Sequence, residues 1–326
     1  MKLMEAEARC LAVQKMVFEQ VHGGKAVNSF SVEKEGWTTV RPDGSTGICD
    51  ISYESTMPNG FLDIWYPNSD HEAKRPTIVN FHGGGFLFGD KVEGDPLAVK
   101  SQSKTDLMGV YMQQGYNYVS ANYAFAPEYR FPSQIVQVNE VLAFLKAHAG
   151  EYGLDMSRIV LTGGSAGADF TQIYAMAVAD PDYAKAIGVT PAVTMEELKC
   201  VIINEAALIA ETQVHSENMV SMIQNWFGDD DFTGCIQAKL ANIPSHIKGV
   251  YPPAYIIASN QDSFFEADAA AMDEVLTRYG LPHKHYYRGP EVEDLPHGFL
   301  GNFETSPSAK ECLAEVLEFM NMFALI

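Results

Sequence analysis

Short apolar runs alternate with longer segments of helical pattern along this chain of 326 residues, and this alternation restricts the fold more than any other feature. Apolar runs of roughly four to eight residues, bounded by turn residues, are typical of strands buried on both faces. The clearest runs lie at residues 77–82, 116–123, 158–163, 199–204 and 254–259. Strands separated by helices form a mostly parallel sheet with helices on both faces, so the chain is predicted to have an α/β fold.

The two ends of the predicted sheet carry signals of their own. Residues 51–55 and 61–67 flank the pair Asn59-Gly60, which favours a tight hairpin, so the sheet is expected to begin with antiparallel strands. Near the other end, residues 283–289 have the pattern of a last strand and residues 309–324 that of a last helix.

Two segments fit the alternation poorly. Residues 1–45 begin with an amphipathic helical pattern and continue as a loop, and residues 206–250 combine a helical stretch with loops. We expect these two segments to pack together as a cap over the sheet. The catalytic domain is then expected to consist of residues 46–205 and 251–326, with the cap segment 206–250 inserted into it.

Composition limits the partners and the compartment. Acidic residues outnumber basic ones by 42 to 22, so nucleic acid and anionic membrane surfaces are unfavourable partners. No apolar run approaches the roughly 18 residues that span a bilayer, and the first residues mix charges into their apolar pattern, unlike a signal peptide. Five widely spaced cysteines without a C-x-x-C pair indicate neither a disulfide framework nor a zinc site. We therefore expect a cytoplasmic protein without a bound metal.

The sequence GGSAG at residues 163–167 joins a predicted strand directly to a predicted helix. This is the G-x-S-x-G pattern of a nucleophile elbow, in which small residues on either side allow a sharp turn that lifts the serine hydroxyl out of the sheet. The pattern alone is weak, but its position between strand and helix strengthens it. Ser165 is therefore the predicted nucleophile.

A serine hydroxyl needs a base to remove its proton and an acid to orient that base. In this kind of sheet both are expected later in the chain, the acid first and the histidine second. Asp262 follows the predicted strand 254–259, and His297 lies in a loop after the last strand. Glu266 and Asp268 are alternatives for the acid, but they fall where a helix should already lead away. The predicted base is His297 and the predicted acid is Asp262.

Three consecutive glycines follow His82 in the sequence NFHGGGFLFGD, at residues 80–90, again directly after a predicted strand. No Gly-Lys-Ser/Thr follows, as a phosphate-binding loop would need, and a G-x-G-x-x-G pattern starting at Gly83 meets Phe88 where its last glycine belongs. A side chain in this loop would block a substrate carbonyl. Its backbone N–H groups, together with that of Ala166, are therefore predicted to bind the oxygen of a tetrahedral intermediate.

Taken together, these motifs resemble the hormone-sensitive-lipase-like branch of the α/β-hydrolase esterases over about residues 48–326. The motifs that carry the resemblance are, in chain order, HGGGF, NYAFAPEYRFP, GGSAG, ASNQDSFFEAD and HGF. The resemblance implies a triad, oxyanion donors, and a cap built from the N-terminus and an insertion after the sixth strand. The implied triad is Ser165, Asp262 and His297, and the implied oxyanion donors are Gly84, Gly85 and Ala166.

The chain departs from the usual pattern of that family on both sides of the elbow. Gly164 precedes the serine where the family usually has Asp, and Ala168 follows Gly167 where a second glycine is usual. These changes leave the predicted chemistry intact.

The predicted function is a serine carboxylic-ester hydrolase that acts on small soluble esters through an acyl-enzyme, without a metal or an organic cofactor. An amide-cleaving relative, such as an arylformamidase or a peptidase, and a ligand-binding protein on the same fold remain open. The sequence does not set the oligomeric state, and a homo-oligomer is compatible with it. Four aromatic residues near the motifs are candidates for lining the substrate pocket, although aromatic residues are common in cores. They are Phe86, Phe88, Tyr123 and Trp226.

Overall fold

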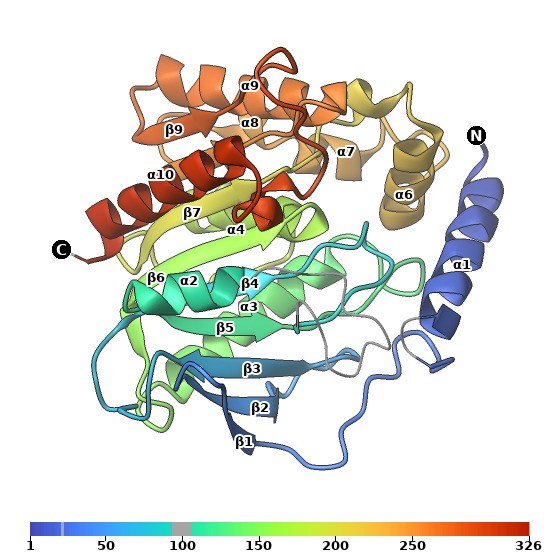
Figure 1. The fold of residues 1–326 in the computed structure, drawn as a ribbon. Helices are drawn as coiled ribbons and strands as arrows, with labels where there is room; N and C mark the ends of the chain where they lie inside the picture. The colour runs from blue at the N-terminus through green and yellow to red at the C-terminus, as the bar shows by residue number, and fades with distance from the viewer. Residues whose placement is uncertain (21–22, 93–105, 326) are drawn as a thin grey trace.

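A nine-stranded sheet forms the centre of the computed structural model, which describes residues 1–20, 23–92 and 106–325. The order of the strands across the sheet is β1-β2-β3-β5-β4-β6-β7-β8-β9 (Figure 1). In chain order they are β1 (Trp37–Val40), β2 (Thr46–Ser52), β3 (Phe61–Tyr66), β4 (Pro76–Phe81), β5 (Asn117–Ala121), β6 (Asp155–Gly164), β7 (Leu198–Asn204), β8 (Ala254–Ile257) and β9 (His283–Tyr286).

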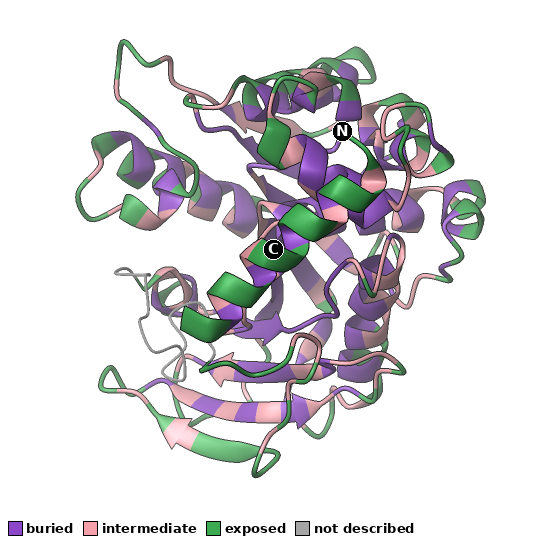
Figure 2. Ribbon diagram, turned by 90° about the vertical axis from the view of Figure 1, so that its right-hand side faces the viewer, coloured by how far each residue is buried: buried purple, intermediate pink, exposed green. Residues whose placement is uncertain are grey.

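The sheet is antiparallel at one edge and parallel elsewhere. The pairs β1–β2, β2–β3 and β3–β5 are antiparallel, and the strands from β5 to β9 are all parallel. Every residue of β4 and β5 is buried, whereas β2 alternates between buried and half-buried residues, as expected for a strand near an exposed edge (Figure 2). The α/β fold, the antiparallel start and the five predicted buried strands are thus confirmed.

Helices cover both faces of the sheet. Helices α2 and α10 share a core with one face, and α3, α4 and α9 share a core with the other (Figure 1). The helices are α1 (Leu3–Gln20), α2 (Leu107–Gln113), α3 (Ser133–Ala147), α4 (Ala166–Ala179), α5 (Pro181–Ala186), α6 (Glu217–Phe227), α7 (Ile236–Ala241), α8 (Ile243–His246), α9 (Ser263–Arg278) and α10 (Pro307–Ala324), with 3₁₀ turns η1 (Ala210–Gln213) and η2 (Phe299–Asn302).

Helices α1 and α6 lie side by side beyond the carboxyl ends of the parallel strands (Figure 1). Arg9 of α1 donates to Asn218 of α6 at 2.6 Å, and the buried Gln14 donates to the carbonyl oxygens of Leu87 at 2.8 Å and Ala126 at 2.7 Å. The N-terminal segment is therefore tied both to α6 and to the loop that follows β4. The division into a cap and a catalytic domain at the boundaries given above stays a prediction.

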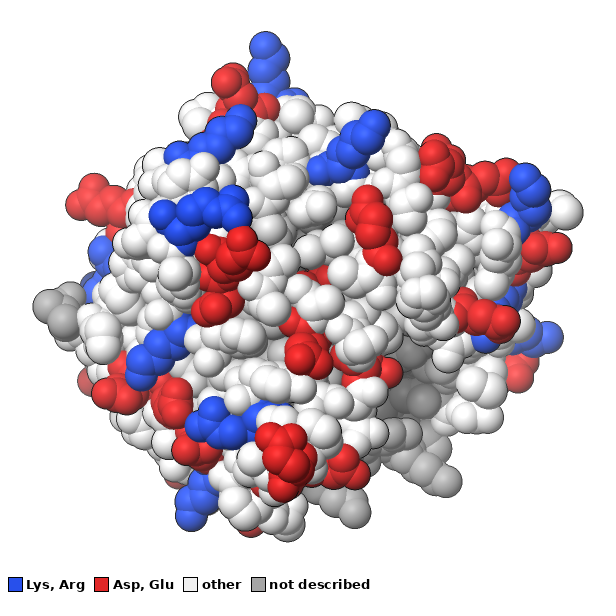
Figure 3. Space-filling view, turned by 90° about the horizontal axis from the view of Figure 1, so that it is seen from above, with Lys and Arg blue, Asp and Glu red and all other residues white. Residues whose placement is uncertain are grey.

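Three further features bear on the expectations from composition: the surface charges, the cysteines and the apolar character of the helices. On the face above α9, acidic and basic side chains are interspersed among uncharged ones (Figure 3). All five cysteines are buried free thiols. Within residues 1–20, 23–92 and 106–325, no helix has the length and apolar character that crossing a membrane requires.

Candidate active site

Ser165 sits at a sharp turn between β6 and α4. Its backbone angles, φ 54° and ψ −123°, belong to a conformation that residues with a side chain rarely adopt. The Ser165 N–H donates to the carbonyl oxygen of Asn204 at 2.9 Å, which fixes the turn to the end of β7. A Cβ atom on Gly167 would overlap the carbonyl oxygen of Phe81, so a glycine is needed for α4 to approach β4 this closely. The sequence-predicted elbow is therefore present.

A cavity of about 250 Å³ opens beside Ser165 at the carboxyl edge of the sheet. It brings Ser165 and His297 into one site together with the glycine loop after β4. The described residues that line it are Asn80, Gly83, Gly84, Leu107, Tyr111, Tyr118, Thr162, Gly163, Gly164, Ser165, Ile202, Asn204, Glu205, His297, Gly298, Leu300 and Gly301.

The imidazole of His297 is held by Glu205, the residue directly after β7. Glu205 Oε2 lies 3.0 Å from His297 Nδ1 and accepts a hydrogen bond from the Gly298 N–H at 2.7 Å. The Glu205 side chain is only 1% exposed, whereas that of His297 is 40% exposed. The ring of Phe265 stacks on the imidazole, with centroids 4.5 Å apart and planes 7° apart. Because a carboxylate occupies Nδ1, Nε2 is the nitrogen left to exchange a proton with a substrate or a nucleophile.

The prediction that Asp262 orients His297 needs correction, because the structure places the carboxylate of Glu205, and not that of Asp262, in contact with His297. Asp262 is half-buried at the N-cap position of α9, and its carboxylate makes no hydrogen bond with a described residue. Asn260 and Gln261 connect this loop to the segment before His297 instead. Asn260 donates to the carbonyl oxygen of Glu293 at 2.7 Å and accepts from the Leu295 N–H at 2.9 Å, and Gln261 donates to Asp294 at 2.6 Å.

Sequence reasoning missed Glu205. Its one signal in the sequence was its position directly after the apolar run 199–204. That run forms the strand next to the elbow strand. The backbone of Glu205 has φ 60°, and its N–H donates to the carbonyl oxygen of Ile257 at 3.0 Å. This positive φ marks a second strained position at the same edge of the sheet.

Two buried carboxylates support the loop that follows Glu205. Asp169 accepts from the Ala207 N–H at 2.8 Å, and Asp268 accepts from the Ile209 N–H at 2.8 Å. Burial raises the pKa of Asp268 to about 7 and raises the pKa of Asp169 well above its usual range. Asp268 was an alternative for the catalytic acid in the sequence analysis. In the structure its carboxylate stabilises this loop by accepting hydrogen bonds from its backbone.

The glycine loop after β4 borders the cavity through Gly83 and Gly84, whereas Gly85 and Ala166 are not among the described residues that line it. Gly84 and Gly85 have φ values of 110° and 58°, and a Cβ atom on Gly85 would overlap the sulfur of Met222 from α6. Neither N–H donates to a described residue. The Ala166 N–H is the first of α4, where an N–H has no partner within the helix. All three groups are therefore available to an acceptor.

The buried side chains of His82 and Tyr123 hold the start of this loop by hydrogen bonds to its backbone. His82 Nδ1 donates to the carbonyl oxygen of Gly83 at 2.7 Å, and the Tyr123 hydroxyl donates to the carbonyl oxygen of His82 at 2.7 Å. The two rings stack with centroids 4.3 Å apart. Tyr123 therefore supports the loop from within the core.

The four aromatic residues predicted to line the substrate pocket are not among the described residues that line the cavity. Phe86 turns inward after Gly85 and stacks on Trp226, with centroids 4.0 Å apart and planes 7° apart. Trp226 is fully buried and donates from Nε1 to Gln134 Oε1 at 2.9 Å. Phe88 and Tyr123 pack into the same core. These residues form the support under the loop, because the turn at the glycines directs the following side chains away from the cavity.

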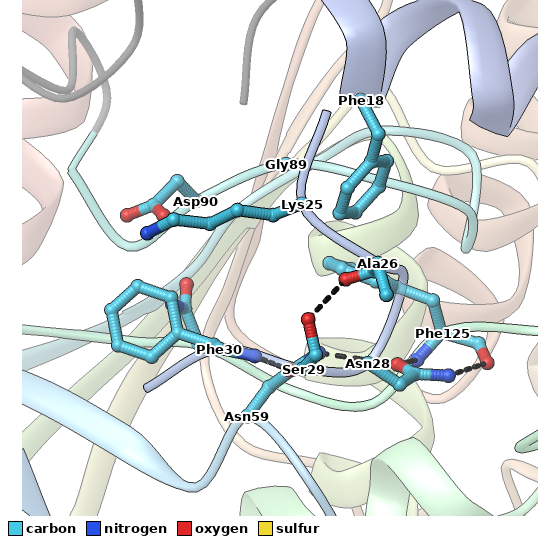
Figure 4. A pocket seen from close by; sticks show the side chains of 11 residues that line it. Phe18, Lys25, Ala26, Asn28, Ser29, Phe30, Asn59, Gly89, Asp90 and Phe125 are labelled. Carbon is cyan, nitrogen blue, oxygen red and sulfur yellow. Dashed lines mark hydrogen bonds between the residues drawn. The ribbon is translucent and has the colours of Figure 1, made fainter. Parts of the chain in front are cut away.

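A second, smaller cavity of about 60 Å³ lies between the N-terminal segment and the loop after β4 (Figure 4). Its amide side chains are already engaged. Asn28 accepts from the Phe125 N–H at 2.8 Å, and Asn59 donates to the carbonyl oxygen of Tyr123 at 3.0 Å. We interpret this region as the anchor of the N-terminal segment. Across the part of the chain that the structure describes, His, Cys, Asp and Glu form no group of three suited to a metal ion.

The strained serine, the histidine with its buried carboxylate and the glycine loop all lie at the carboxyl edge of a mostly parallel sheet, and this arrangement defines a serine hydrolase of the α/β-hydrolase class. Solved structures agree on the fold. Esterase B from Lactobacillus Rhamnosis matches with a TM-score of 0.72 at 19% identity, over 99% of this chain and 94% of that protein.

Residues 62–272, more than half of the chain, match the family model described as BD-FAE. The chain belongs to the BD-FAE family. Two curated relatives from Mycobacterium tuberculosis are similar to it. Esterase LipI is 24% identical over 81% of this chain and 78% of its own length, and Carboxylesterase NlhH is 27% identical over 72% and 70%. The chain spans about half the length of a third relative from the same organism, the probable carboxylic ester hydrolase LipM, of which it covers 49%.

These findings confirm the class that the sequence predicts. The chain is an α/β-hydrolase of the hormone-sensitive-lipase-like type, a serine hydrolase of the carboxylesterase kind.

Proposed function

We propose that the chain hydrolyses small soluble carboxylic esters and that the reaction passes through an acyl-enzyme on Ser165. One observation carries the proposal: the strained Ser165 shares a cavity with His297, whose Nδ1 is occupied by the buried carboxylate of Glu205. This arrangement leaves His297 Nε2 available in the cavity that the half-buried Ser165 also lines.

In the proposed reaction, His297 Nε2 removes the proton from the Ser165 hydroxyl as the oxygen attacks the ester carbonyl. The tetrahedral intermediate collapses, and His297 returns the proton to the leaving alcohol. A water molecule then attacks the acyl-enzyme with His297 again acting as base, which releases the carboxylic acid and restores Ser165.

Glu205 serves as the positioning acid in this scheme. Its carboxylate accepts a hydrogen bond from the Nδ1–H of His297 and stabilises the imidazolium that forms in each half of the reaction. The contact at 3.0 Å and the near-complete burial of Glu205 favour it over Asp262, which has no hydrogen bond to a described residue.

The developing oxyanion is proposed to accept hydrogen bonds from the backbone N–H groups of Gly84, Gly85 and Ala166. Donors held in place before the reaction need no reorganisation, and removing one such donor costs about 10² to 10³ in kcat in well-studied hydrolases. His82 and Tyr123 keep the loop in place by their contacts with its first carbonyl groups.

Small esters are the proposed substrates because the cavity, at about 250 Å³, is smaller than the roughly 300 to 1,000 Å³ of sites for drug-sized ligands. In the proposed cap, α1 and α6 lie over the carboxyl edge, whereas β1, which falls within the predicted cap segment 1–45, belongs to the sheet. A structure of Esterase B is known with a tributyrin phosphonate, a mimic of a short-chain ester, and this relative supports the same substrate size.

The test is a panel of aryl esters of increasing acyl length, each paired with the anilide of the same acid. We expect turnover to be highest with short acyl groups, to fall as the chain lengthens, and to be far lower on every anilide. Faster cleavage of an anilide than of its matched ester would favour the amide-cleaving alternative. A protein that turns over no activated ester would favour the ligand-binding alternative.

A further inference from the structure

A buried glutamine of the N-terminal helix contacts the loop that carries two of the proposed oxyanion donors. Gln14 lies on the inner face of α1 and is 1% exposed. Ala6, Cys10 and Phe18 are the other buried residues of this helix. Burying a carboxamide without a hydrogen bond costs free energy, so a buried amide is normally paired. The partners of Gln14 therefore indicate its role.

Both hydrogen-bond acceptors of Gln14 are backbone carbonyl groups close to the glycine loop. Gln14 Nε2 donates to the carbonyl oxygen of Leu87 at 2.8 Å and to that of Ala126 at 2.7 Å. The two acceptor segments are also joined directly, because the Ala126 N–H donates to the carbonyl oxygen of Phe86 at 3.0 Å. One side chain of α1 therefore fixes the loop after β4 against the loop after β5.

The backbone that Gln14 holds contains a strained residue. Gly84 and Gly85 lie at positive φ, which glycine adopts readily, and Phe86 follows them at φ 68° although it has a side chain. Such a conformation costs about 1 to 3 kcal/mol and persists only where the surrounding structure imposes it. The Leu87 N–H closes the turn on the carbonyl oxygen of Gly84 at 3.0 Å, and Gln14 holds the carbonyl oxygen of Leu87. Gln14 is thus one of the groups that impose this conformation.

A second buried glutamine attaches the start of the chain without reaching the glycine loop. Gln224 of α6 is also 1% exposed, and its Nε2 donates to the carbonyl oxygens of Met1 at 2.9 Å and Asp230 at 3.0 Å. The N-terminal segment is therefore fastened to the cap at another point. Attachment of this segment does not by itself explain why Gln14 reaches the loop after β4.

We propose that Gln14 is a positioning residue for the oxyanion donors, whose two hydrogen bonds keep the N–H groups of Gly84 and Gly85 where the oxyanion forms. Gln14 is not among the described residues that line the cavity beside Ser165, so it acts through the loop and not on the substrate. The inference rests on the proposed function, because it requires that these N–H groups bind the oxyanion.

The Gln14→Met variant tests the proposal, because it removes both donors at similar length and volume. We expect kcat on a short aryl ester to fall about tenfold, less than the roughly 10² to 10³ for loss of a whole donor, because the loop is displaced and not removed. KM should stay within about twofold, since the oxyanion forms only after the substrate has bound. Gln14→Asn keeps the amide on a shorter side chain that reaches less far, and it should show the same pattern. Activity is expressed per Ser165 labelled by an activated phosphonate ester, so unfolded molecules do not count.

A trifluoromethyl ketone inhibitor reports on the oxyanion donors separately. Ser165 Oγ adds to its carbonyl carbon, the serine proton passes to His297, and the carbonyl oxygen becomes an oxyanion. Because this adduct resembles the tetrahedral intermediate, its inhibition constant should rise about tenfold in Gln14→Met, in step with the fall in kcat/KM. A smaller folded fraction would not change the inhibition constant, so this measurement separates positioning from a merely structural role.

Gln224→Met is the matched control. It makes the same chemical change at a buried glutamine that donates to two backbone carbonyl groups, away from the glycine loop. We expect its kcat, KM and inhibition constant to stay at the wild-type values.

Three results would overturn the inference. They are a wild-type kcat in Gln14→Met, a fall in kcat without a matching rise in the inhibition constant, and an equal fall in Gln224→Met. In each case the activity of the wild-type enzyme would still support the ester hydrolase. A wild-type protein that neither cleaves the aryl ester nor is labelled at Ser165 would count against the proposed function itself.

Discussion

Replacing Glu205 with glutamine tests the proposed support of His297. The charge centres of Glu205 and a protonated His297 are about 4 Å apart, given the contact of 3.0 Å between Oε2 and Nδ1. At an effective dielectric constant of about 20, their attraction is worth about 4 kcal/mol. A change of about 1.36 kcal/mol in the activation free energy changes the rate tenfold. Loss of the charge should therefore lower kcat about a thousandfold.

The shape of the site should survive this substitution. Both donors, His297 Nδ1 and the Gly298 N–H, point at the same oxygen of Glu205, and the amide oxygen of glutamine can take that place. The fall should therefore appear in kcat on a short aryl ester, with a smaller change in KM.

Asp262→Asn is the matched control, because it makes the same kind of change at a half-buried carboxylate without a hydrogen bond to a described residue. We expect its kcat to stay within a few-fold of wild type. If Asp262→Asn loses as much activity as Glu205→Gln, or more, the assignment of the positioning acid to Glu205 is refuted.

Two further predictions concern the glycine loop and a buried carboxylate. Gly85→Ala should lower kcat about a hundredfold, because the added methyl group would overlap Met222 and displace an oxyanion donor. Gly188→Ala is the control, since Gly188 also has a positive φ but has open space around it, and its kcat should stay unchanged. Equal losses of kcat in the two variants would contradict this prediction. Asp268 is favoured in its neutral form by burial, with a pKa of about 7, so its contribution to stability is complete below about pH 4 and is lost as the pH rises through about 7. Melting temperatures measured from pH 4.5 to 8 should therefore fall more in wild type than in Asp268→Asn, and parallel curves would speak against this titration.

The sheet and the elbow were predictable because local sequence determines them. Buried parallel strands need continuous apolar runs, and the turn at Ser165 needs a small residue such as Gly167, where α4 comes into contact with the backbone of β4. The exposed strand β1 escaped prediction, since its four residues, Trp37–Val40, have no apolar run that would mark them.

The acid was not predictable in this way, because tertiary structure selects it. Strands β7 and β8 end at the same edge, and each is followed by an acidic residue, Glu205 or Asp262. Sequence spacing does not say which of the two loops reaches His297. In the structure the side chain of Asn260 holds the second loop, and Asp262 is carried into the N-cap position of α9. The prediction that four aromatic residues line the substrate pocket was wrong for a similar reason. The turn at Gly85, and not the sequence pattern, determines the direction of the Phe86 side chain.

The formation of an acyl-enzyme on Ser165 is tested most directly by covalent labelling. The enzyme is incubated with an activated phosphonate ester, digested and examined by peptide mass spectrometry. A single adduct on Ser165 is expected, no adduct in Ser165→Ala, and turnover in that variant lower by about a million-fold, with the remainder due to binding and the oxyanion donors. An adduct on another serine, or an alanine variant with near-normal esterase activity, would contradict the proposed mechanism.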